Sequence, residues 1–240
     1  MKSFKAFLRP IYRTIIPNTY LAELGKELKD CKSVLDLGCG SKSPIGNFPK
    51  TFYAEGVEIY KPSIEQSKKK KIHDKYHNIN MLNIGKKIKP KSFDCVLALD
   101  VIEHLDKDEG ARLINLMEKI AKKVLIVVMP NGYLGHSNPD IEYDEIKENP
   151  HQSHKSGWSA KEMKDLEFKV IGIGGFKFLK GDCPKQIKWK PWIFWKIVSD
   201  LSALFLRNKP EWSFELYCIK KTINKLKLIT TEYDYGDYQD

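Results

Sequence analysis

The stretch Val34-Leu35-Asp36-Leu37-Gly38-Cys39-Gly40 decides the fold of this chain. A short apolar run that ends in two closely spaced glycines predicts a buried strand, followed by a turn whose backbone can approach a bound ligand. A second apolar run closes with Glu58, about 20 residues after Gly38, where a carboxylate can accept hydrogen bonds from both hydroxyls of a ribose. Together the two features predict a nucleoside site, without saying which nucleoside.

The third glycine of the dinucleotide pattern G-x-G-x-x-G is absent, because Ser43 stands in its place and Pro44 follows. That glycine lets a helix N-terminus press against a pyrophosphate, so its absence argues against a nicotinamide cofactor. Asp36 would face a phosphate unfavourably but could help to hold an ammonium group. S-adenosylmethionine carries an ammonium and a sulfonium and no phosphate, so the pattern favours it. An NAD-dependent oxidoreductase is the least favoured alternative, and a tight turn with an incidental Asp36 stays open.

Short apolar runs alternate with helical patterns along the chain, which predicts an α/β fold. The run from Val124 to Val128 is continuously apolar, as expected for a parallel strand covered by helices on both faces. We expect a doubly wound, seven-stranded, mostly parallel sheet, with an N-terminal helix and a helical insertion before the last strand. The expected strands are Ser33–Leu37, Tyr53–Ile59, Ile79–Leu82, Phe93–Leu99, Lys123–Val128, Phe168–Ile173 and Phe214–Ile219, and the expected helices are Tyr20–Leu28, Ser63–Lys71, Glu109–Ala121 and Ala160–Leu166.

The expected organisation is one main domain with two short ends. Residues 1–29 are a basic segment and a helix, residues 30–222 are the α/β domain with the insertion at about 185–209, and residues 223–240 are a C-terminal tail that is acidic from Thr230 onward. A chain of 240 residues can bury one good core, and a second full domain would leave too little of it.

The segments from Val34 to Gly40, from Gly56 to Glu58 and from Ser92 to Leu105 resemble the successive signatures of class I S-adenosylmethionine-dependent methyltransferases of the ubiquinone-biosynthesis type. The resemblance covers about Lys32 to Phe176. It implies a Rossmann-like sheet, methyl transfer, and S-adenosylmethionine as the cofactor, and it says little about the substrate.

The resemblance also implies which residues hold the cofactor. The family commonly has Asp where Asn80 stands, although an Asn amide oxygen can still accept a hydrogen bond from the adenine amino group. Lys42, where many members have a small residue, is a second departure and could point outward. The implied residues are Asp36, Gly38, Cys39 and Gly40 for the methionine part, Glu58 for the ribose, Asn80 and Met81 for the adenine, and Leu99 and Asp100 beside the sulfur.

The methyl-acceptor side is predicted directly after the fourth strand. Methyl transfer from a sulfonium is an in-line displacement, and a hydroxyl acceptor needs a base as well as correct positioning. His104 could be that base, with Glu103 or Asp100 orienting its ring. The alternative is that Glu103 and His104 only cap the following helix or structure the loop.

A metal-assisted alternative rests on a later histidine. Asp100, Glu103 and His104, followed by His154, resemble the spacing in metal-dependent RNA 3′-terminal ribose methyltransferases and in some ubiquinone O-methyltransferases. Two carboxylates and two imidazoles could hold a divalent cation. Those families prefer Glu where Asp100 stands, so no metal ligand is part of the main prediction.

The connection that follows Met129 is a candidate lid, because about 25 residues pass without a clear helical or strand pattern. We expect it to overhang the acceptor pocket. Its candidate substrate contacts are Tyr133, His136, His151 and His154.

The formal charge of +10 indicates an anionic neighbour, either nucleic acid, phospholipid or an acidic substrate. Runs such as Lys68 to Lys71 are more typical of a solvated helix face, so nucleic acid is the less favoured partner. The five cysteines show no C-x-x-C spacing and predict a reduced, cytoplasmic protein. We find no signal-peptide pattern, and no apolar stretch long enough to span a membrane.

Three tryptophans with flanking lysines lie in the insertion, within Lys188-Trp189-Lys190-Pro191-Trp192-Ile193-Phe194-Trp195-Lys196. Apolar residues continue at helical spacing to Leu204. The pattern predicts a helix packed on the sheet or on a partner subunit, or alternatively a helix at a membrane interface that brings the enzyme to an amphipathic acceptor.

The sequence therefore predicts methyl transfer to an oxygen, less often a nitrogen, of a small-molecule, lipid-linked or glycan-like acceptor. One alternative is a metal-dependent RNA ribose methyltransferase. Another is a non-catalytic methyltransferase-like binding protein, for which Asn80 and Lys42 are the motive. The identity of the acceptor and the oligomeric state do not follow from the sequence.

Overall fold

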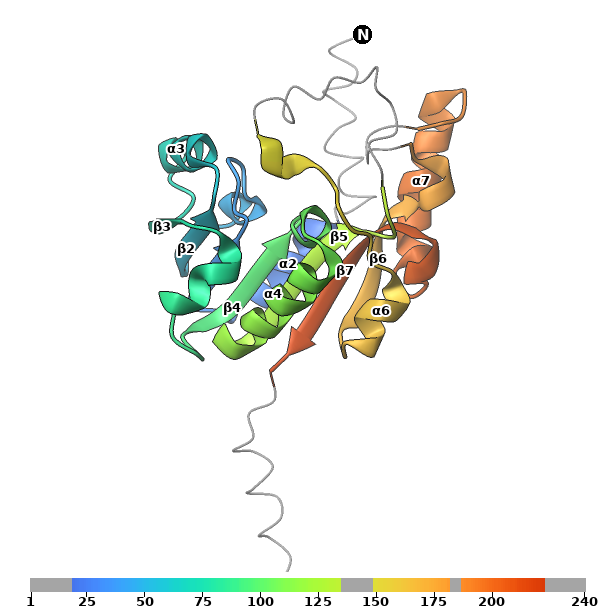
Figure 1. The fold of residues 1–240 in the computed structure, drawn as a ribbon. Helices are drawn as coiled ribbons and strands as arrows, with labels where there is room; N and C mark the ends of the chain where they lie inside the picture. The colour runs from blue at the N-terminus through green and yellow to red at the C-terminus, as the bar shows by residue number, and fades with distance from the viewer. Residues whose placement is uncertain (1–18, 135–148, 182–186, 223–240) are drawn as a thin grey trace, which may run out of the picture.

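The computed structural model describes residues 19–134, 149–181 and 187–222. A seven-stranded sheet forms its centre, in the order β3-β2-β1-β4-β5-β7-β6 (Figure 1). Only β7 runs antiparallel to its neighbours, β5 and β6, which confirms the expected mostly parallel sheet. The strands are β1 (Ser33–Leu37), β2 (Tyr53–Glu58), β3 (Lys75–Asn78), β4 (Phe93–Leu99), β5 (Ala121–Pro130), β6 (Lys169–Phe176) and β7 (Ser213–Lys221).

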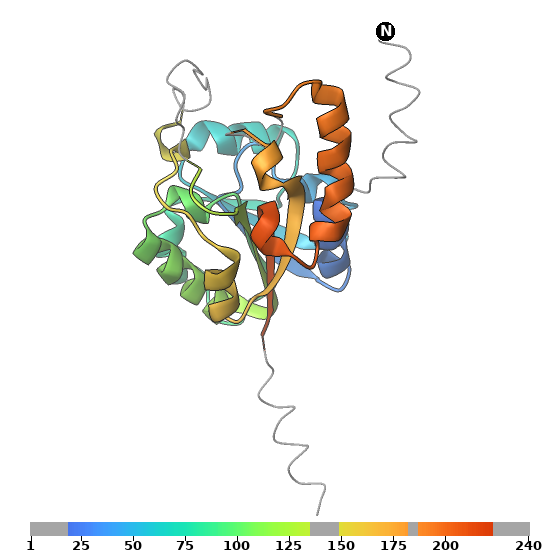
Figure 2. The same ribbon diagram turned by 90° about the vertical axis from the view of Figure 1, so that its right-hand side faces the viewer.

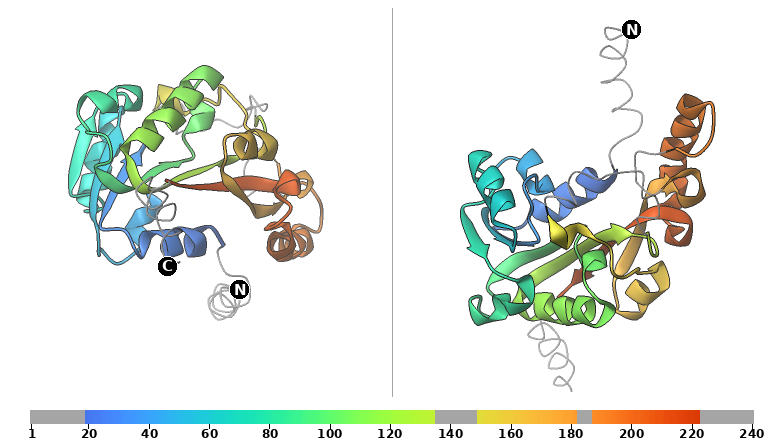
Figure 3. Two further views of the ribbon diagram at one scale, coloured as in Figure 1. Left: turned by 90° about the horizontal axis from the view of Figure 1, so that it is seen from below. Right: turned by 45° about the horizontal axis from the view of Figure 1, so that its top comes forward.

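Helices cover both faces of the sheet (Figure 3), which completes the doubly wound fold. α4 and α6 lie on one face, where Leu113 and Met117 of α4 are fully buried. α2 and α7 lie on the other, where Leu24 of α2 is fully buried. α3 packs beside β2 and β3. The helices are α2 (Thr19–Leu28), α3 (Lys61–Lys69), α4 (Lys107–Ile120), α6 (Ala160–Asp165) and α7 (Trp192–Leu206).

The strand expected at Ile79–Leu82 is wrong. The third strand is Lys75–Asn78, and Met81–Lys86 forms a 3-10 helix, η2. β3 is an edge strand that pairs only with β2, so its sequence carries no continuous apolar run. The apolar side chains of Ile79, Met81 and Leu82 pack against the core from the turn instead.

The other expected elements are confirmed within three residues at each end. A capping box starts α6, with Ser159 Oγ accepting the Glu162 N–H at 3.2 Å and Glu162 Oε2 accepting the Ser159 N–H at 2.8 Å. The insertion before the last strand contains α7, as expected.

Cys31, Cys39, Cys95 and Cys218 are buried and unpaired, as predicted for reduced cysteines. Cys183 and His136 lie outside the described residues, as do most of the basic N-terminal segment and the acidic tail. Within the described ranges, no helix has the length and apolar character needed to cross a membrane.

The strand order reverses between β1 and β4, since the chain moves from β1 outward to β3 and then returns to the other side of β1. In open α/β sheets the crevice at this reversal, beyond the carboxyl ends of the strands, is where ligands bind. The fold therefore directs attention to the loops that follow β1 and β4.

Candidate active site

The turn after β1 is built on two glycines with left-handed backbone, Gly38 at φ 68° and Gly40 at φ 53°. The N–H of Gly38 donates to the carbonyl of Val57 at 2.8 Å, which ties the turn to β2. A Cβ atom on Gly38 would lie 2.6 Å from Cγ2 of Val101, whereas one on Gly40 would meet nothing within 4 Å. Gly38 is therefore required both for its backbone conformation and for its close approach to the segment after β4.

Glu58 ends β2 with its carboxylate held beside this turn. Oε2 accepts the N–H of Gly40 at 3.1 Å, and Oε1 accepts the N–H of Tyr60 at 2.8 Å. The two main-chain bonds fix the carboxylate, and each oxygen keeps lone-pair capacity for a second donor. This arrangement fits the predicted role of Glu58 toward ribose hydroxyls.

Asp36 lies beneath the turn. It is 1% exposed, and its Oδ2 is bonded to Ser43 Oγ at 2.5 Å and to His73 Nε2 at 2.9 Å. A buried carboxylate with two such partners stabilises the turn from below. Ser43, which replaces the third glycine of the dinucleotide pattern, is thus one of the groups that hold Asp36 in place.

A pocket of about 270 Å³ opens at the carboxyl ends of β1, β2 and β4. It brings together residues from both halves of the prediction, the cofactor side and the acceptor side. The predicted cofactor and catalytic residues in its lining are Gly38, Glu58, Asn80, Met81, Asp100 and His104. The predicted cofactor and catalytic residues that do not line it are Asp36, Cys39, Gly40, Leu99 and Glu103.

Two of the residues outside the lining have clear structural places. Cys39 is 3% exposed, and its N–H donates to Val57. Leu99 is buried in the apolar cluster that includes residues of α2. Lys42 is exposed and points outward, as expected.

Asn80 caps η2, since its Oδ1 accepts the N–H of Leu82 at 2.9 Å. Its amide N–H₂ is the group that remains to donate toward the pocket, together with the second lone pair of Oδ1. Met81 lies next to it and is partly buried. With Asn80 in place of the Asp that the family commonly has, the side chain that caps η2 is neutral instead of negatively charged.

Three carboxyl groups lie near the end of β4. Removal from bulk water raises the pKa of Asp100 to about 6, and removal from water together with the charge of Asp100 raises the pKa of Glu215 to about 7. The same two causes, in that order, raise the pKa of Glu103 well above its usual range. Glu103 is 3% exposed, and its Oε2 has no hydrogen-bond partner among the described residues. Such a buried acceptor fits a site that binds a cation or a proton donor.

Glu103, His104 and His154 form one cluster, in which one ligand atom from each residue lies within 4.8 Å of the others. Nδ1 of His104 is bonded to the carbonyl of Ser153 at 3.3 Å, and Nδ1 of His154 to the carbonyl of Leu134 at 2.8 Å. A ring whose Nδ1 donates to a carbonyl carries its lone pair on Nε2. The structure thus assembles the acid and both imidazoles of the predicted metal set, with Asp100 in the adjoining pocket.

One wall of the pocket comes from the segment 149–155, far along the chain from the strand-end loops. Asn149, His151, Gln152 and Lys155 line the pocket. The segment is fixed because the N–H groups of Lys155 and Ser156 both donate to the carbonyl of Glu103, at 2.8 and 3.1 Å. Of these residues, sequence reasoning singled out only His151.

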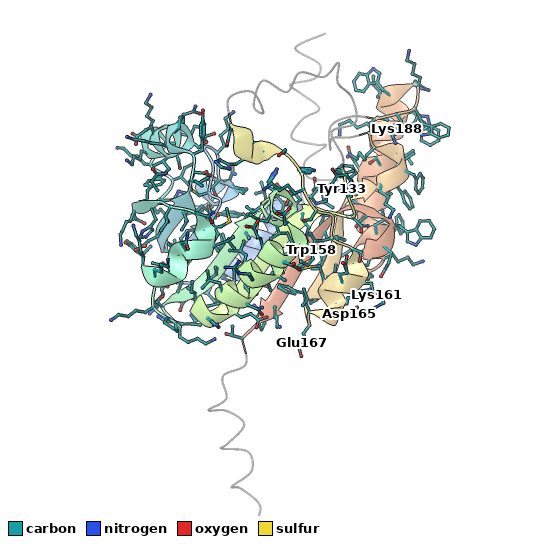
Figure 4. All side chains as sticks on the ribbon, in the orientation of Figure 1. Tyr133, Trp158, Lys161, Asp165, Glu167 and Lys188 are labelled. Carbon is teal, nitrogen blue, oxygen red and sulfur yellow. The ribbon has the colours of Figure 1, made fainter. Side chains whose placement is uncertain are left out.

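The residues just after this wall anchor it to α4 and to the end of β5. Trp158 (Figure 4) packs so close to α4 that a Cβ on Gly110 would lie 2.6 Å from its ring. Lys107 Nζ lies 4.1 Å from the centre of the same ring. The carbonyl of Trp158 accepts the N–H of Gly132 at 2.8 Å. These contacts attach the pocket wall to α4 and to the end of β5.

The remaining lining residues have weaker sequence signals. Ile59, Val101 and Leu105 give the pocket an apolar part, and each directly follows or precedes a residue that was predicted. Glu109 belongs to the first turn of α4, where an acidic residue is expected for helix reasons alone.

Comparisons with known proteins also indicate a methyltransferase. The sequence matches the profile of a family described as a methyltransferase domain over residues 8–171. A search of curated proteins returns no match. Among solved structures, the fold resembles a SAM dependent methyltransferase from Archaeoglobus fulgidus, with a TM-score of 0.56, 19% identity, and coverage of 85% of this chain and 92% of that one.

Two further solved structures are similar at the level of the fold. One is the methyltransferase domain of bacterial CtHen1-C, with a TM-score of 0.53, 16% identity, and coverage of 87% of this chain and 98% of that one. The other is the plantazolicin methyltransferase BamL, in complex with a triazolic desmethylPZN analog and SAH, with a TM-score of 0.51, 17% identity, and coverage of 92% and 88%.

The sheet order and the pocket at the strand reversal define a class I methyltransferase. The matched profile spans more than half of the chain, so the chain belongs to this family of methyltransferase domains, and S-adenosylmethionine is its methyl donor. The NAD-dependent alternative is thereby set aside. The ubiquinone-biosynthesis type stays a prediction.

Proposed function

We propose that the protein transfers a methyl group from S-adenosylmethionine to a hydroxyl oxygen of a small-molecule, lipid-linked or glycan-like acceptor. The observation that carries the proposal is the single pocket that joins Gly38, Glu58 and Asn80 with Asp100 and His104. Gly38, Glu58 and Asn80 suit a nucleoside. Asp100 and His104 suit a cationic centre and a hydroxyl that must lose its proton. A pocket of this composition matches the two needs of O-methyl transfer, donor binding and acceptor deprotonation.

The cofactor side of the proposal rests on Glu58 and Gly38. The Glu58 carboxylate is already fixed by two main-chain N–H groups and would accept from ribose hydroxyls. Gly38 leaves the space that a Cβ would fill. When bound, S-adenosylmethionine supplies a methyl group activated by its positive sulfur, and Asp100 is the pocket carboxylate whose charge would favour that cation.

The acceptor side rests on His104. A hydroxyl must lose its proton as the new bond to carbon forms, and a neutral imidazole takes it at the nitrogen that carries the lone pair. The bond between Nδ1 and the Ser153 carbonyl favours the form of His104 with that lone pair on Nε2. His104 also lines the pocket, which supports the proposal that it meets the acceptor.

The first test is a calorimetric titration with S-adenosylhomocysteine. We expect binding in the micromolar range, and no heat at high micromolar ligand would remove the cofactor side of the proposal. The second test incubates the protein with methyl-tritiated S-adenosylmethionine and separate panels of phenols, sugars and extracted lipids. His104→Ala should lower the rate about 100-fold or more with unchanged S-adenosylhomocysteine binding, since a general base contributes that much.

His151→Ala is the matched control, because His151 is a second histidine that lines the same pocket. It should retain the rate within about tenfold if His104 is the base. Equal losses in the two variants, or full activity of His104→Ala, would contradict the role of His104 and leave the cofactor assignment standing.

A second candidate is methyl transfer assisted by a divalent cation, and the cluster of Glu103, His104 and His154 favours it. Metal-binding histidines commonly donate their other ring N–H to a carbonyl, as both rings of this cluster do. A bound cation would supply the acidity that a hydroxyl needs to lose its proton. The buried Oε2 of Glu103 supports the same reading.

Metal content separates this candidate from the first. Mass-spectrometric analysis after dialysis against Mg²⁺, Mn²⁺ or Zn²⁺ should give about one ion per chain, and Glu103→Gln or His154→Ala should abolish it while His151→Ala retains it. An RNA acceptor would then become testable with a short RNA that ends in a free 3′ ribose, against the same RNA blocked by a 3′ phosphate. Absence of bound metal in all three conditions would refute this candidate.

A further inference from the structure

α7 lies at the outside of the molecule (Figure 2), and large apolar side chains along it are exposed. Phe205 is 78% exposed, and the other large apolar residues of this surface are between 41% and 56% exposed. We call this surface the α7 outer face. Its residues are Trp192, Ile193, Phe194, Ile197, Leu201, Leu204 and Phe205. A helix on a folded domain normally places such side chains toward the core, so their exposure needs a cause.

The opposite face of α7 explains why the large side chains point outward. Ser199 and Ser202 are buried against β6, together with Leu206 at the end of the helix. The approach is so close that a Cβ on Gly175 would lie 2.2 Å from the carbonyl of Ser199. Small residues thus face the sheet and bulky ones face away. The outer face contributes nothing to the described core, and its composition fits burial in a separate apolar phase.

Basic residues surround the start of this helix. Lys188 and Lys190 precede α7 and are exposed, and Figure 4 labels Lys188 beside this helix. Residues 188–212 contain five basic and two acidic side chains. Both acids are already paired, Asp200 with Lys196 at 2.6 Å and Glu211 with Lys164 at 2.5 Å. Arg207 is paired with Glu23 at 2.8 Å, so the positive charge next to the apolar surface comes from Lys188, Lys190 and Lys209.

Aromatic rings gather where the charge and the apolar surface meet. The ring centres of Trp189 and Trp195 lie 5.7 Å apart, and those of Phe194 and Trp195 lie 5.2 Å apart. Trp189 is 54% exposed. Tryptophan with flanking lysine is the composition that favours the boundary between lipid headgroups and acyl chains.

We propose that the α7 outer face binds the surface of an anionic phospholipid membrane, with Lys188 and Lys190 at the headgroup phosphates. Lipid phosphate complements this charge, whereas a second copy of the chain would bring like charges together around the same patch. The helix lies in the interface and does not cross the bilayer, in agreement with the absence of a spanning helix among the described residues.

The position of α7 gives the docking a consequence for the substrate. α7 extends past the sheet at the end where η4 (Pro150–Gln152) lies, and residues of η4 line the pocket (Figures 1 and 3). A membrane held by the outer face would lie at the pocket end of the molecule. This consequence rests on the proposed function and selects a lipid-linked acceptor, while the docking itself does not depend on methyl transfer.

The test is co-sedimentation of the full chain with vesicles, without cofactor, so that it is independent of catalysis. Vesicles of phosphatidylcholine and phosphatidylglycerol in equal parts should bind the protein, and pure phosphatidylcholine should bind it at least tenfold more weakly. The triple variant Ile193→Ser, Ile197→Ser, Leu201→Ser should lower binding to the anionic vesicles at least tenfold. These side chains are exposed, so thermal unfolding of the variant should match the wild type.

Charge is tested with two double variants of equal net charge. Lys188→Glu with Lys190→Glu should lower binding at least tenfold, whereas Lys86→Glu with Lys87→Glu, at exposed positions at the end of η2 and directly after it, should change it by less than threefold. Wild-type protein that stays in the supernatant with anionic vesicles would overturn the proposal. So would equal losses in the two double variants, or a triple variant that changes a dimer into a monomer in light scattering while vesicle binding stays unchanged.

Discussion

Replacement of Gly38 by Ala tests why the first turn needs glycine. A non-glycine residue at φ 68° costs about 1–2 kcal/mol from backbone strain. The added Cβ also meets Val101 Cγ2 at 2.6 Å, and overpacking of this kind costs about 1–3 kcal/mol more. Gly40→Ala is the matched control, because its φ of 53° carries the same strain and its Cβ has nothing within 4 Å.

We expect Gly40→Ala to lower the free energy of unfolding by about 1–2 kcal/mol, and Gly38→Ala by about 2–5 kcal/mol. Val101→Ala removes the methyl that the new Cβ would meet. Combined with Gly38→Ala it should recover about 1–3 kcal/mol relative to the sum of the single changes.

The assay is urea unfolding, followed by circular dichroism, for the wild type and these four variants. A titration with S-adenosylhomocysteine provides a second readout, because Gly38 lines the pocket and Val101 lies beside it. Equal costs for the two glycine variants, or a coupling near zero with Val101→Ala, would refute the claim that close packing against Val101 makes Gly38 necessary.

Three further predictions concern carboxyl groups. Glu58→Gln should weaken S-adenosylhomocysteine binding about 10- to 100-fold in calorimetry, since a charged acceptor is lost, while Glu109→Gln in the same pocket should change it little. The pKa of Asp100 is raised to about 6 by removal from water, so its carboxyl group ionises as the pH rises through 6. A cationic ligand favours its ionised form, and affinity for S-adenosylmethionine should therefore increase from pH 5 to 7 in the wild type and not in Asp100→Asn. Arg207 lowers the pKa of Glu23 to about 2. The stabilisation of the fold by this ion pair is therefore present above pH 4.5 and is lost as the pH falls toward 2. Glu23→Gln should cost about 1–3 kcal/mol in urea unfolding at pH 7 and less at pH 3.

The sheet was predictable because its central strands are buried on both faces. The apolar runs of β1, β4 and β5 are long enough to mark a strand without any tertiary information. β3 has neighbours on one side only, and Lys75-Tyr76-His77-Asn78 carries no such run. The nearby apolar residues from Ile79 to Leu82 attracted the strand assignment, although they pack from a turn.

The site was predictable where a residue's role follows from its own loop. Gly38 and Glu58 are fixed by main-chain geometry at strand ends, and both line the pocket as expected. Asp36 is different, because its burial depends on His73, which comes 37 positions later. Nothing in the local sequence distinguishes a carboxylate that faces the ligand from one that faces such a partner.

The wall of the pocket was missed for a similar reason. Asn149 and Lys155 follow a long connection with no regular pattern, and Lys155 is held by a main-chain bond to Glu103, which lies about 50 positions earlier in the sequence. Loop residues of this kind carry no periodic signal, so only the fold brings them to the site.

The bonds from Lys155 and Ser156 to the carbonyl of Glu103 are made by main-chain groups alone. Almost any side chain can therefore stand at position 155 without weakening this attachment. Over evolutionary time the wall can exchange the side chains that meet the acceptor, while its path across the pocket stays the same. The same property makes residues 149–155 the natural segment in which to select variants with a new acceptor.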